Sequence, residues 1–307
     1  MGIRGVIIKG VGGLYTVFTV DGQMECRARG AFRHERISPT VGDRVRLALE
    51  AESYIIDVIE DRRNLLIRPP MANLDTLFAI IPTCRPAPDL SSVDKLLCIA
   101  EHADIDAAVI ITKREMDEDA ASRMADIYRR VGYNVFPVSA ETGEGLDGLS
   151  SYIGSLGCGK STDSDMIVTA FAGASGAGKS TLLNKLYPDL HLGTGALSRR
   201  ISRGRQTTRH VELYPTGEGS RIYVADTPGF SLLDFERFDF FSVEALPFTF
   251  REFEPYHGKC RYTKCTHVCE DGCAVIDAVN GGTIPRERHE SYRALYAILK
   301  DKRPWDK

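Results

Sequence analysis

Residues 173–180 read Gly-Ala-Ser-Gly-Ala-Gly-Lys-Ser, which is the pattern of a phosphate-binding loop. The apolar run 167–172 before it predicts a strand, and residues 180–186 after it predict a helix. In this arrangement backbone N–H groups surround phosphate oxygens, and the lysine reaches the β- and γ-phosphates. The stretch therefore predicts an α/β nucleotide-binding domain. The expected nucleotide contacts are Gly173, Ala174, Ser175, Gly176, Ala177, Gly178, Lys179, Ser180 (also a Mg²⁺ ligand) and Thr181.

The same pattern occurs a second time, at residues 154–161. This copy follows residues 149–153, which read as the end of a helix, and leads into the polar turn 162–165. A phosphate-binding loop needs a strand before it and a helix after it, and both are missing here. We therefore interpret residues 154–161 as part of a linker.

Downstream of the loop, the apolar run 222–225 ends at Asp226-Thr227-Pro228-Gly229. An aspartate at a strand end can hold Mg²⁺, and the N–H of Gly229 can meet the γ-phosphate. The basic, glycine-bearing segment 203–210 lies in between, and either Thr207 or Thr208 would complete the Mg²⁺ coordination when the γ-phosphate is present. The alternative for this segment is a solvated loop whose threonines cap helices.

A motif that reads the base is expected before the phosphate-binding loop. The strand-like run 107–111 ends at Thr112-Lys113-Arg114-Glu115. A carboxylate at that place can accept two hydrogen bonds from guanine that adenine cannot supply, and the lysine stem can lie along the purine. We expect Thr112, Lys113 and Glu115 to contact GTP.

A second strand-like run, 134–138, ends at Ser139 and Ala140, whose backbone N–H groups are expected to meet guanine O6. A helix-like segment, 118–130, separates the two strand ends. In ordinary guanine-nucleotide switches the phosphate-binding loop comes first and the base is read later. The opposite order here predicts a circularly permuted domain, which keeps the site because ligands bind at the carboxyl ends of the strands.

The order of these motifs resembles that of the circularly permuted GTPases of the ribosome small subunit-dependent GTPase A family, over nearly the whole chain. The resemblance implies a GTPase that binds GTP or GDP with Mg²⁺. Its partner would be the small (30S) ribosomal subunit with its 16S rRNA, which would stimulate hydrolysis late in assembly. It also implies a cytoplasmic monomer. The family usually has Asn-Lys-x-Asp where this chain has Thr112–Glu115, and often a histidine where this chain has Gln206.

Hydrolysis is expected to proceed by attack of water on the γ-phosphate, catalysed mainly by positioning and charge. Phe230 follows Gly229, where Ras-like proteins place a glutamine that orients the water, so we predict slow intrinsic hydrolysis. Gln206, His210 or a group from the ribosome would supply the missing contact. The expected catalytic residues are Lys179, Gln206, Thr208, His210, Asp226 and Gly229.

The C-terminal region carries a metal-binding pattern of cysteines and a histidine. Cys260, Cys265, His267 and Cys273 provide four ligands of the kind found in closed tetrahedral zinc sites, and Cys269 is a fifth candidate. The family pattern matches the first four, so we predict one structural Zn²⁺ with Cys269 outside the site. A disulfide is the alternative. Residues 284–300 predict an amphipathic helix packed on this module.

The N-terminal stretch contains short strand-like runs, including 5–9, 14–20 and 54–59, separated by glycine-containing turns. This pattern fits a small five-stranded barrel, and the resemblance implies an oligonucleotide-binding (OB) fold. Charge runs are often only solvated faces, but the arginines of this stretch are expected to contact RNA phosphates. They are Arg27, Arg29, Arg33, Arg36, Arg44 and Arg46.

The chain has 307 residues, of which 43% are apolar, and a net charge of −3. A net negative charge argues against a uniformly basic polymer binder, so RNA contact must be local. No apolar run is long enough to span a membrane, and the N-terminus does not resemble a signal peptide, so we expect a cytoplasmic protein. We predict an OB-type β-barrel (1–68), a circularly permuted α/β P-loop GTPase domain (69–235) and a mostly α-helical zinc module (236–307).

Two other functions remain open from the residues alone. In one, the chain is an ATP-using P-loop enzyme and residues 112–115 form only a turn. In the other, it is a zinc- and RNA-binding protein whose nucleotide site does not hydrolyse. Comparison of GTP with ATP binding separates the first from a GTPase, and a hydrolysis assay separates the second.

Overall fold

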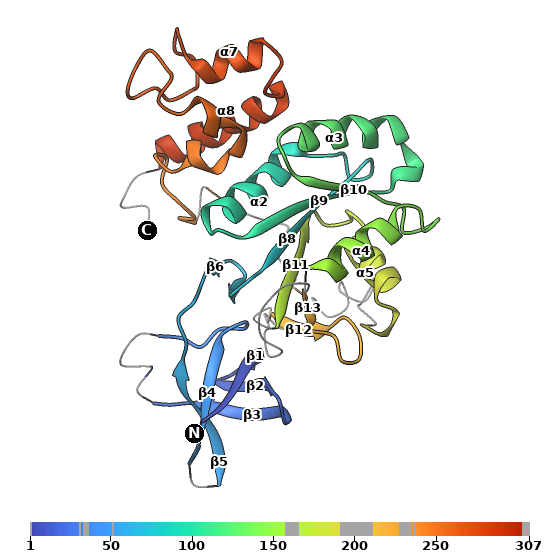
Figure 1. The fold of residues 1–307 in the computed structure, drawn as a ribbon, viewed down its shortest axis with the longest axis vertical. Helices are drawn as coiled ribbons and strands as arrows, with labels where there is room; N and C mark the ends of the chain where they lie inside the picture. The colour runs from blue at the N-terminus through green and yellow to red at the C-terminus, as the bar shows by residue number, and fades with distance from the viewer. Residues whose placement is uncertain are drawn as a thin grey trace. The chain divides into compact units, whose positions relative to one another are not determined.

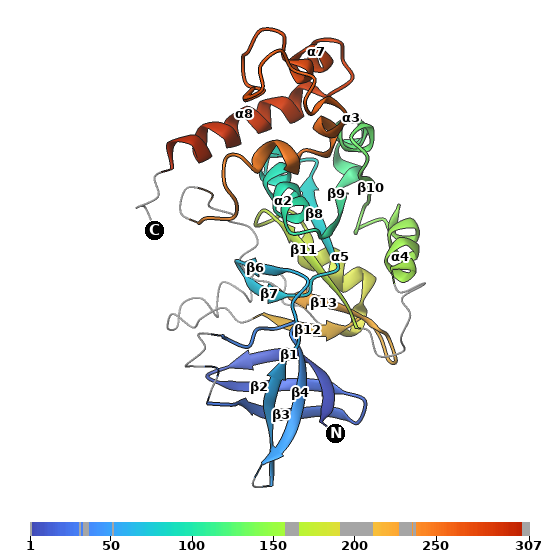
Figure 2. The same ribbon diagram turned by 60° about the vertical axis from the view of Figure 1, so that its left-hand side comes forward.

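A computed structural model describes residues 2–30, 32, 37–50, 52–156, 166–190, 211–226, 235 and 238–302 (Figures 1 and 2). The chain divides into two compact units, which we describe separately. The first unit contains residues 1–77, 149–171 and 180–230, and the second contains residues 78–148, 172–179 and 231–307.

The first unit begins with a five-stranded barrel, drawn in blue in Figure 1. Its strands follow the order β1-β2-β3-β5-β4, and β4 pairs back with β1 to close the barrel. All of these pairs are antiparallel except β3 with β5. The predicted barrel is thus confirmed. The strands are β1 (Ile3–Val11), β2 (Leu14–Thr19), β3 (Gly22–Ala28), β4 (Arg44–Glu50) and β5 (Ser53–Ile59).

The barrel forms because apolar side chains recur at alternate positions, which places them on one face of each strand. Ile7, Val17, Leu47 and Ile56 are fully buried inside it. At Gly5 a side chain would not fit, since a Cβ there would lie 2.5 Å from the Val17 side chain.

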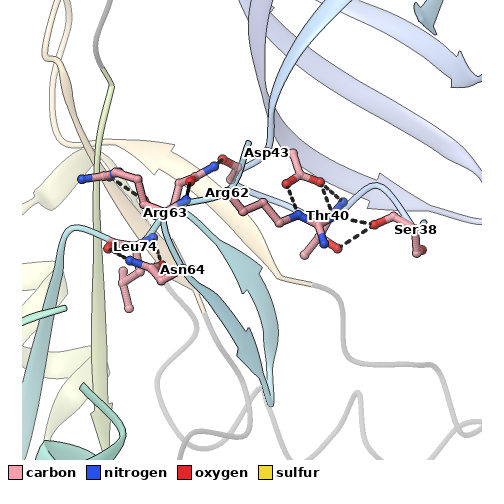
Figure 3. A network of polar contacts seen from close by, with 9 residues as sticks. Ser38, Thr40, Asp43, Arg62, Arg63, Asn64 and Leu74 are labelled. Carbon is pink, nitrogen blue, oxygen red and sulfur yellow. Dashed lines mark hydrogen bonds and ion pairs between the residues drawn. The ribbon is translucent and has the colours of Figure 1, made fainter. Parts of the chain in front are cut away.

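A polar network fixes the segment that leads into β4 (Figure 3). The carboxylate of Asp43 is fully buried and accepts two hydrogen bonds from Arg62, at 2.7 and 2.8 Å, and one from the Thr40 N–H at 2.7 Å. Arg62 also donates to the Ser38 carbonyl at 2.8 Å. The hydrogen bond that Arg62 donates to Asp43 raises the pKa of Arg62, so this guanidinium stays charged. This network holds residues 38–40 against the barrel.

The rest of the first unit extends the sheet beyond β1. Strand β12 pairs antiparallel with β1, where Lys9 and Glu212 form an ion pair of 3.0 Å, and β13 continues the sheet to β11. Strands β11 and β13 run parallel. The elements are β6 (Leu65–Ile67), β7 (Pro70–Ala72), β11 (Ile167–Gly173), β12 (Glu212–Pro215), β13 (Ile222–Asp226), α4 (Leu146–Ser155), α5 (Lys179–Leu186) and η2 (Pro188–Leu190).

The second unit contains strands in the order β10-β9-β8 with helices α2 and α3. Gly173 at the end of β11 lies against β8, where a Cβ would approach the Ile80 carbonyl oxygen to 2.5 Å. Asp89 and Asp117 cap the two helices by accepting from backbone N–H groups. The elements are β8 (Thr76–Pro82), α2 (Leu90–His102), β9 (Asp106–Thr112), η1 (Arg114–Met116), α3 (Glu118–Arg130) and β10 (Asn134–Pro137).

The C-terminal part of the second unit is mostly helical (red in Figure 2). Tyr292, Leu295 and Leu299 are buried along one side of its last helix, which confirms the predicted amphipathic helix. No helix in the described part of the chain has the length and apolar character to cross a membrane. The elements are η3 (Leu246–Thr249), η4 (Arg251–Tyr256), α7 (Ala274–Asn280) and α8 (Arg286–Asp301).

A buried arginine ties α8 to the rest of the second unit. Arg288 is fully buried and bonds Asp94 of α2 at 2.5 Å and Glu252 of η4 at 2.7 Å. Its guanidinium also lies 4.5 Å from the centre of the Phe250 ring. Burial alone would lower the pKa of Arg288, but the two carboxylates raise it well above its ordinary value. The arginine is therefore charged inside the protein.

Candidate nucleotide site and metal centre

The phosphate-binding loop follows β11 and leads into α5, as the sequence predicts. Gly176 and Gly178 adopt φ angles of +83° and +90°. Few residues other than glycine adopt this conformation without strain, so the backbone of the loop depends on both glycines. The Ala177 N–H turns back to the Ala174 carbonyl at 3.1 Å. A tight turn of this kind brings successive N–H groups together, which suits an anion.

The predicted base-reading motif is bonded directly to this loop within the second unit. The Thr112 hydroxyl donates to the Ala177 carbonyl at 2.6 Å, and Lys113 Nζ donates to the Gly176 carbonyl at 3.0 Å and to the Arg85 carbonyl. Thr112 is only 2% exposed. The two segments are 65 residues apart at the first of these bonds, and the bonds bring them into direct contact.

The backbone of the motif turns sharply after β9. Lys113 has a φ of +60°, and its carbonyl accepts from the Thr83 hydroxyl at 2.7 Å. The Arg114 N–H donates to the Val138 carbonyl at 3.2 Å. Glu115 lies exposed in the short helix η1 that follows. The turn therefore directs the Lys113 side chain to the phosphate-binding loop. It leaves the Glu115 carboxylate in solvent, where it is accessible to the base of a nucleotide.

The second predicted strand end is a closed turn. Ser139 is fully buried, its N–H donates to the Glu144 carbonyl at 2.9 Å, and its hydroxyl accepts from the Thr142 N–H at 3.0 Å. Arg114 forms an ion pair of 2.8 Å with Glu144, which joins this turn to the base-reading motif. Sequence reasoning missed Glu144. Its only signal in the sequence was a negative charge, opposite to that of Arg114, two residues after Thr142.

The predicted Mg²⁺ ligands of the first unit come from two neighbouring elements. Strand β13 ends at Asp226 and runs parallel to β11, with Ala170 opposite Ala225, so their carboxyl ends face the same edge. Ser180 lies in the first turn of α5. The side chain of Asp226 lies outside the described structure, as do residues Gln206, Thr207, Thr208, His210, Gly229 and Phe230 and residues 157–161 of the second loop-like match.

The predicted zinc ligands converge in the C-terminal part of the second unit. The ligand atoms of Cys260, Cys265, His267 and Cys273 all lie within 4.8 Å of one another. The Cys260 and Cys273 sulfurs lie 3.9 Å apart, and His267 Nδ1 lies 3.6 Å from Cys260 Sγ and 3.4 Å from Cys273 Sγ. Tetrahedral zinc holds such atoms about 3.5–3.8 Å apart, so the geometry fits this ion.

Hydrogen bonds from helix α8 hold the loop that carries the predicted zinc ligands. His289 Nε2 lies 2.7 Å from the His267 carbonyl, and the Tyr292 hydroxyl donates to the Thr266 carbonyl at 2.6 Å. Burial opposes ionisation of Glu270, but hydrogen bonds from Thr266 and neighbouring N–H groups lower its pKa to about 2. Cys269 is exposed and lies outside the four-atom cluster. Helix α8 thus shapes the metal centre.

The predicted RNA-binding arginines that the structure describes lie on the barrel. Arg44 and Arg46 are on β4, and Arg46 Nε lies 3.9 Å from Glu60. Arg27 is on β3, and Arg29 just beyond it forms an ion pair of 2.8 Å with Asp57. Arg33 and Arg36 lie outside the described residues.

Comparison with known proteins places these features in one family. The family described as RsgA GTPase matches residues 59–236, and the RsgA N-terminal domain matches residues 4–55. "Small ribosomal subunit biogenesis GTPase RsgA" of Caldanaerobacter subterraneus subsp. tengcongensis is 39% identical over 303 residues, which cover 98% of this chain and 97% of that protein. The protein of the same name from Geobacillus thermodenitrificans is 39% identical over 308 residues, 98% of this chain and 99% of its own.

Two solved structures share the whole fold. The crystal structure of YjeQ from Thermotoga maritima superposes with a TM-score of 0.80 at 29% identity, covering 99% of this chain and 100% of that one. The crystal structure of YloQ, a circularly permuted GTPase, superposes with a TM-score of 0.75 at 30% identity, covering 99% of this chain and 97% of that one.

Proposed function

Because the chain belongs to the RsgA GTPase family, we propose that it hydrolyses GTP as a biogenesis factor of the small ribosomal subunit. The predicted fold is confirmed, since a barrel precedes a circularly permuted GTPase domain and a helical part with a Cys₃His cluster follows. The relatives' names, over nearly their full lengths, support the ribosomal assignment.

One observation carries the nucleotide assignment. The hydroxyl of Thr112 and the ammonium group of Lys113 donate to carbonyls of the phosphate-binding loop, at Ala177 and Gly176. A base-reading motif must stand at a fixed distance from the phosphates to bind base and phosphate of one nucleotide. These bonds hold the two segments together although they occur in reversed order, which supports the assignment.

We assign the guanine contacts to the base-reading motif and to the turn after β10. Glu115 is exposed and would accept hydrogen bonds from guanine N1 and N2. The Ser139 N–H already donates to Glu144 within its turn, so we assign the contact with guanine O6 to the Ala140 N–H. The proposed GTP contacts are Thr112, Lys113, Glu115, Ala140 and Gly173 to Thr181, and the role proposed for Ser139 is to shape the turn that presents Ala140.

The proposed Mg²⁺ ligands are Ser180, Asp226 and one of Thr207 and Thr208. A serine at a helix start and an aspartate at the end of a neighbouring parallel strand provide the oxygen donors that Mg²⁺ prefers. When bound, the ion would neutralise charge on the phosphates. Lys179 would hold the β- and γ-phosphates, Gly229 would sense the γ-phosphate, and Gln206 or His210 would orient the attacking water.

We propose the barrel, residues 1–68, as an RNA-binding domain, with residues 69–235 as the GTPase domain and 236–307 as the zinc domain. The N-terminal match at residues 4–55 and the GTPase match at 59–236 support these boundaries. The proposed partner is the small (30S) ribosomal subunit with its 16S rRNA. We propose that the chain is a cytoplasmic monomer and binds this subunit late in its maturation. Arg27, Arg29, Arg33, Arg36, Arg44 and Arg46 would contact phosphates.

The function is tested by release of phosphate from GTP with and without isolated 30S subunits. We expect slow hydrolysis by the free protein and a marked increase when subunits are added. Titration with GTP and ATP is the companion measurement, and we expect GTP to bind more tightly. Equal affinity for the two nucleotides would contradict the guanine assignment, and a rate that subunits leave unchanged would contradict the ribosomal one.

The Thr112 hydroxyl gives a direct test of the permuted site. In Thr112→Val the shape is kept, but the Ala177 carbonyl loses its buried donor, which costs about 1–3 kcal/mol. We expect GDP affinity to fall about 5- to 150-fold. Thr112→Ser keeps the hydroxyl and serves as the control, with affinity near that of the wild type. Fluorescence titration with a labelled GDP measures both, and equal affinities for the valine and serine variants would show that the bond is unimportant.

The metal centre predicts one zinc ion per chain, measured by elemental analysis of the purified protein. Cys273 is buried within the cluster, so Cys273→Ser is expected to lose the ion and to destabilise the C-terminal part. Cys269→Ser is the matched control, because Cys269 is exposed and outside the cluster. If the Cys269 variant lost zinc and the Cys273 variant kept it, the proposed ligand set would be wrong.

A further inference from the structure

Two separate segments of the second unit carry the groups that would read guanine. Glu115 lies in η1 after β9, and Ala140 lies in the turn after β10. The two strands are parallel neighbours with Pro137 opposite Ile111, so their carboxyl ends meet at one edge of the sheet (Figure 1). The distance between the Glu115 carboxylate and the Ala140 N–H therefore depends on how these two strand ends are joined.

The turn that carries Ala140 is closed by its own backbone. The Ser139 N–H donates to the Glu144 carbonyl at 2.9 Å and so bridges the turn. Gly145, which follows, has a φ of +79°, and a Cβ there would lie 2.4 Å from the Pro137 carbonyl oxygen. A side chain would not fit at this position, so the turn lies close against the end of β10. A displacement of Glu144 therefore also displaces Ala140.

An ion pair joins this turn to the base-reading motif. Nη1 of Arg114, the residue directly before Glu115, lies 2.8 Å from Oε1 of Glu144. The Arg114 N–H also donates to the Val138 carbonyl at 3.2 Å. Arg114 is thus bonded to the second strand end through both its backbone and its side chain. The Arg114 side chain is 32% exposed and that of Glu144 is 50% exposed, so replacing either one leaves no buried charge behind.

Guanine is distinguished from adenine when two contacts form together. A carboxylate accepts from the guanine N1–H and N2 amine, and a backbone N–H donates to O6. Adenine has no N2 amine and carries a donor, the N6 amine, in place of O6. The Glu115 side chain is long and exposed, so it loses rotamer freedom when it binds. A fixed backbone beneath this side chain leaves less freedom to be lost.

We propose that Arg114 and Glu144 form a clasp that sets the separation of the two guanine-reading groups. Arg114 is then a positioning residue, which acts through Glu115 and Ala140 and holds them at the spacing of one guanine edge. The clasp selects a purine with an oxygen at C6, while the phosphates are bound by the loop 173–180. The inference rests on the proposed function, since it names the pair that decides the base at the same site.

Binding of GDP and ADP to the full-length protein tests the clasp in Arg114→Gln, which removes the charge. We expect GDP affinity to fall about two- to fivefold, as suits a half-exposed ion pair, and ADP affinity to stay unchanged. With 30S subunits, KM for GTP is expected to rise by the same factor while kcat stays the same, because the base lies away from the γ-phosphate. Equal losses for GDP and ADP, or no loss of GDP affinity, would overturn the proposal.

Arg123→Gln is the matched control for this variant. Arg123 is an exposed arginine of α3, the helix that follows the motif, so its replacement changes the net charge equally without touching the clasp. We expect its GDP and ADP affinities to match those of the wild type. A fall in GDP affinity as large as that of Arg114→Gln would overturn the proposal, because net charge alone would then explain the loss.

A charge swap shows whether the pair itself is responsible. Arg114→Glu and Glu144→Arg each place like charges at the clasp, and we expect each to weaken GDP binding more than Arg114→Gln does. The double variant rebuilds the pair with its charges exchanged, and its GDP affinity is expected to return to within about twofold of the wild type. A double variant that binds GDP no better than the weaker of the two single variants would contradict the clasp.

The wild-type protein separates failure of the clasp from failure of the proposed function. If the wild type prefers GDP to ADP and 30S subunits stimulate its GTP hydrolysis, but Arg114→Gln keeps the same preference, only the clasp fails. If the wild type binds the two nucleotides equally, the guanine assignment fails, and the clasp fails with it.

Discussion

Replacement of Lys179 by alanine is expected to lower the rate of GTP hydrolysis about 10²- to 10³-fold, as the loss of one preorganised donor to a developing charge does in other enzymes. Lys179 begins α5 directly after the two glycines that shape the loop. Its ammonium group would contact the β- and γ-phosphates and stabilise charge in the transition state. The measurement is phosphate release at saturating GTP in the presence of 30S subunits.

Lys185→Ala is the matched control for this experiment. Lys185 is an exposed lysine in the last turn of the same helix, so its loss changes the net charge equally without touching the loop. We expect its rate to match that of the wild type. If Lys179→Ala hydrolysed GTP as fast as Lys185→Ala, the loop would be a non-hydrolysing site, and the zinc- and RNA-binding alternative would gain support.

Removal of Arg288 is the second change with a large expected effect. In Arg288→Ala the carboxylates of Asp94 and Glu252 remain buried without the cation that bonds them. Breaking a buried ion pair by removing one partner costs about 3–5 kcal/mol, and we expect the free energy of unfolding to fall by this amount. Urea unfolding followed by circular dichroism measures the change.

Two further variants define the cause of that loss. Arg293→Ala removes an exposed arginine of the same helix and is expected to change stability by less than about 0.5 kcal/mol. Asp94→Asn added to Arg288→Ala is expected to restore part of the stability, because one uncompensated carboxylate is removed. A double variant no more stable than Arg288→Ala alone would show that the lost packing, and not the charge, causes the effect.

The local elements around the motifs were predictable because each motif requires its own surroundings. The phosphate-binding loop is followed by α5, Lys179–Leu186, close to the predicted 180–186, and α3 spans the predicted 118–130. Strand β2 was expected to reach Val20 but ends at Thr19, where Val20 is 85% exposed before the turn. Edges of elements depend on such tertiary burial, which periodicity does not contain.

The contacts that join distant segments could not be predicted from the sequence. Thr112 was expected to contact GTP, but its bond to the Ala177 carbonyl depends on the path of two loops. The sequence does carry a signal at Arg288, which lies four residues before Tyr292 and therefore on the same buried side of α8. A charged residue at an apolar position indicates a buried ion pair, although the sequence cannot name Asp94 as the partner.

The Arg288–Asp94 pair has a consequence for the order in which the protein is made. Asp94 leaves the ribosome 194 residues before its partner does. At about 5–20 residues per second, helix α2 waits roughly 10–40 s for the cation that neutralises its buried carboxylate. During synthesis α2 therefore cannot reach its final burial until α8 has emerged, so a helix that is translated much later completes the packing of α2.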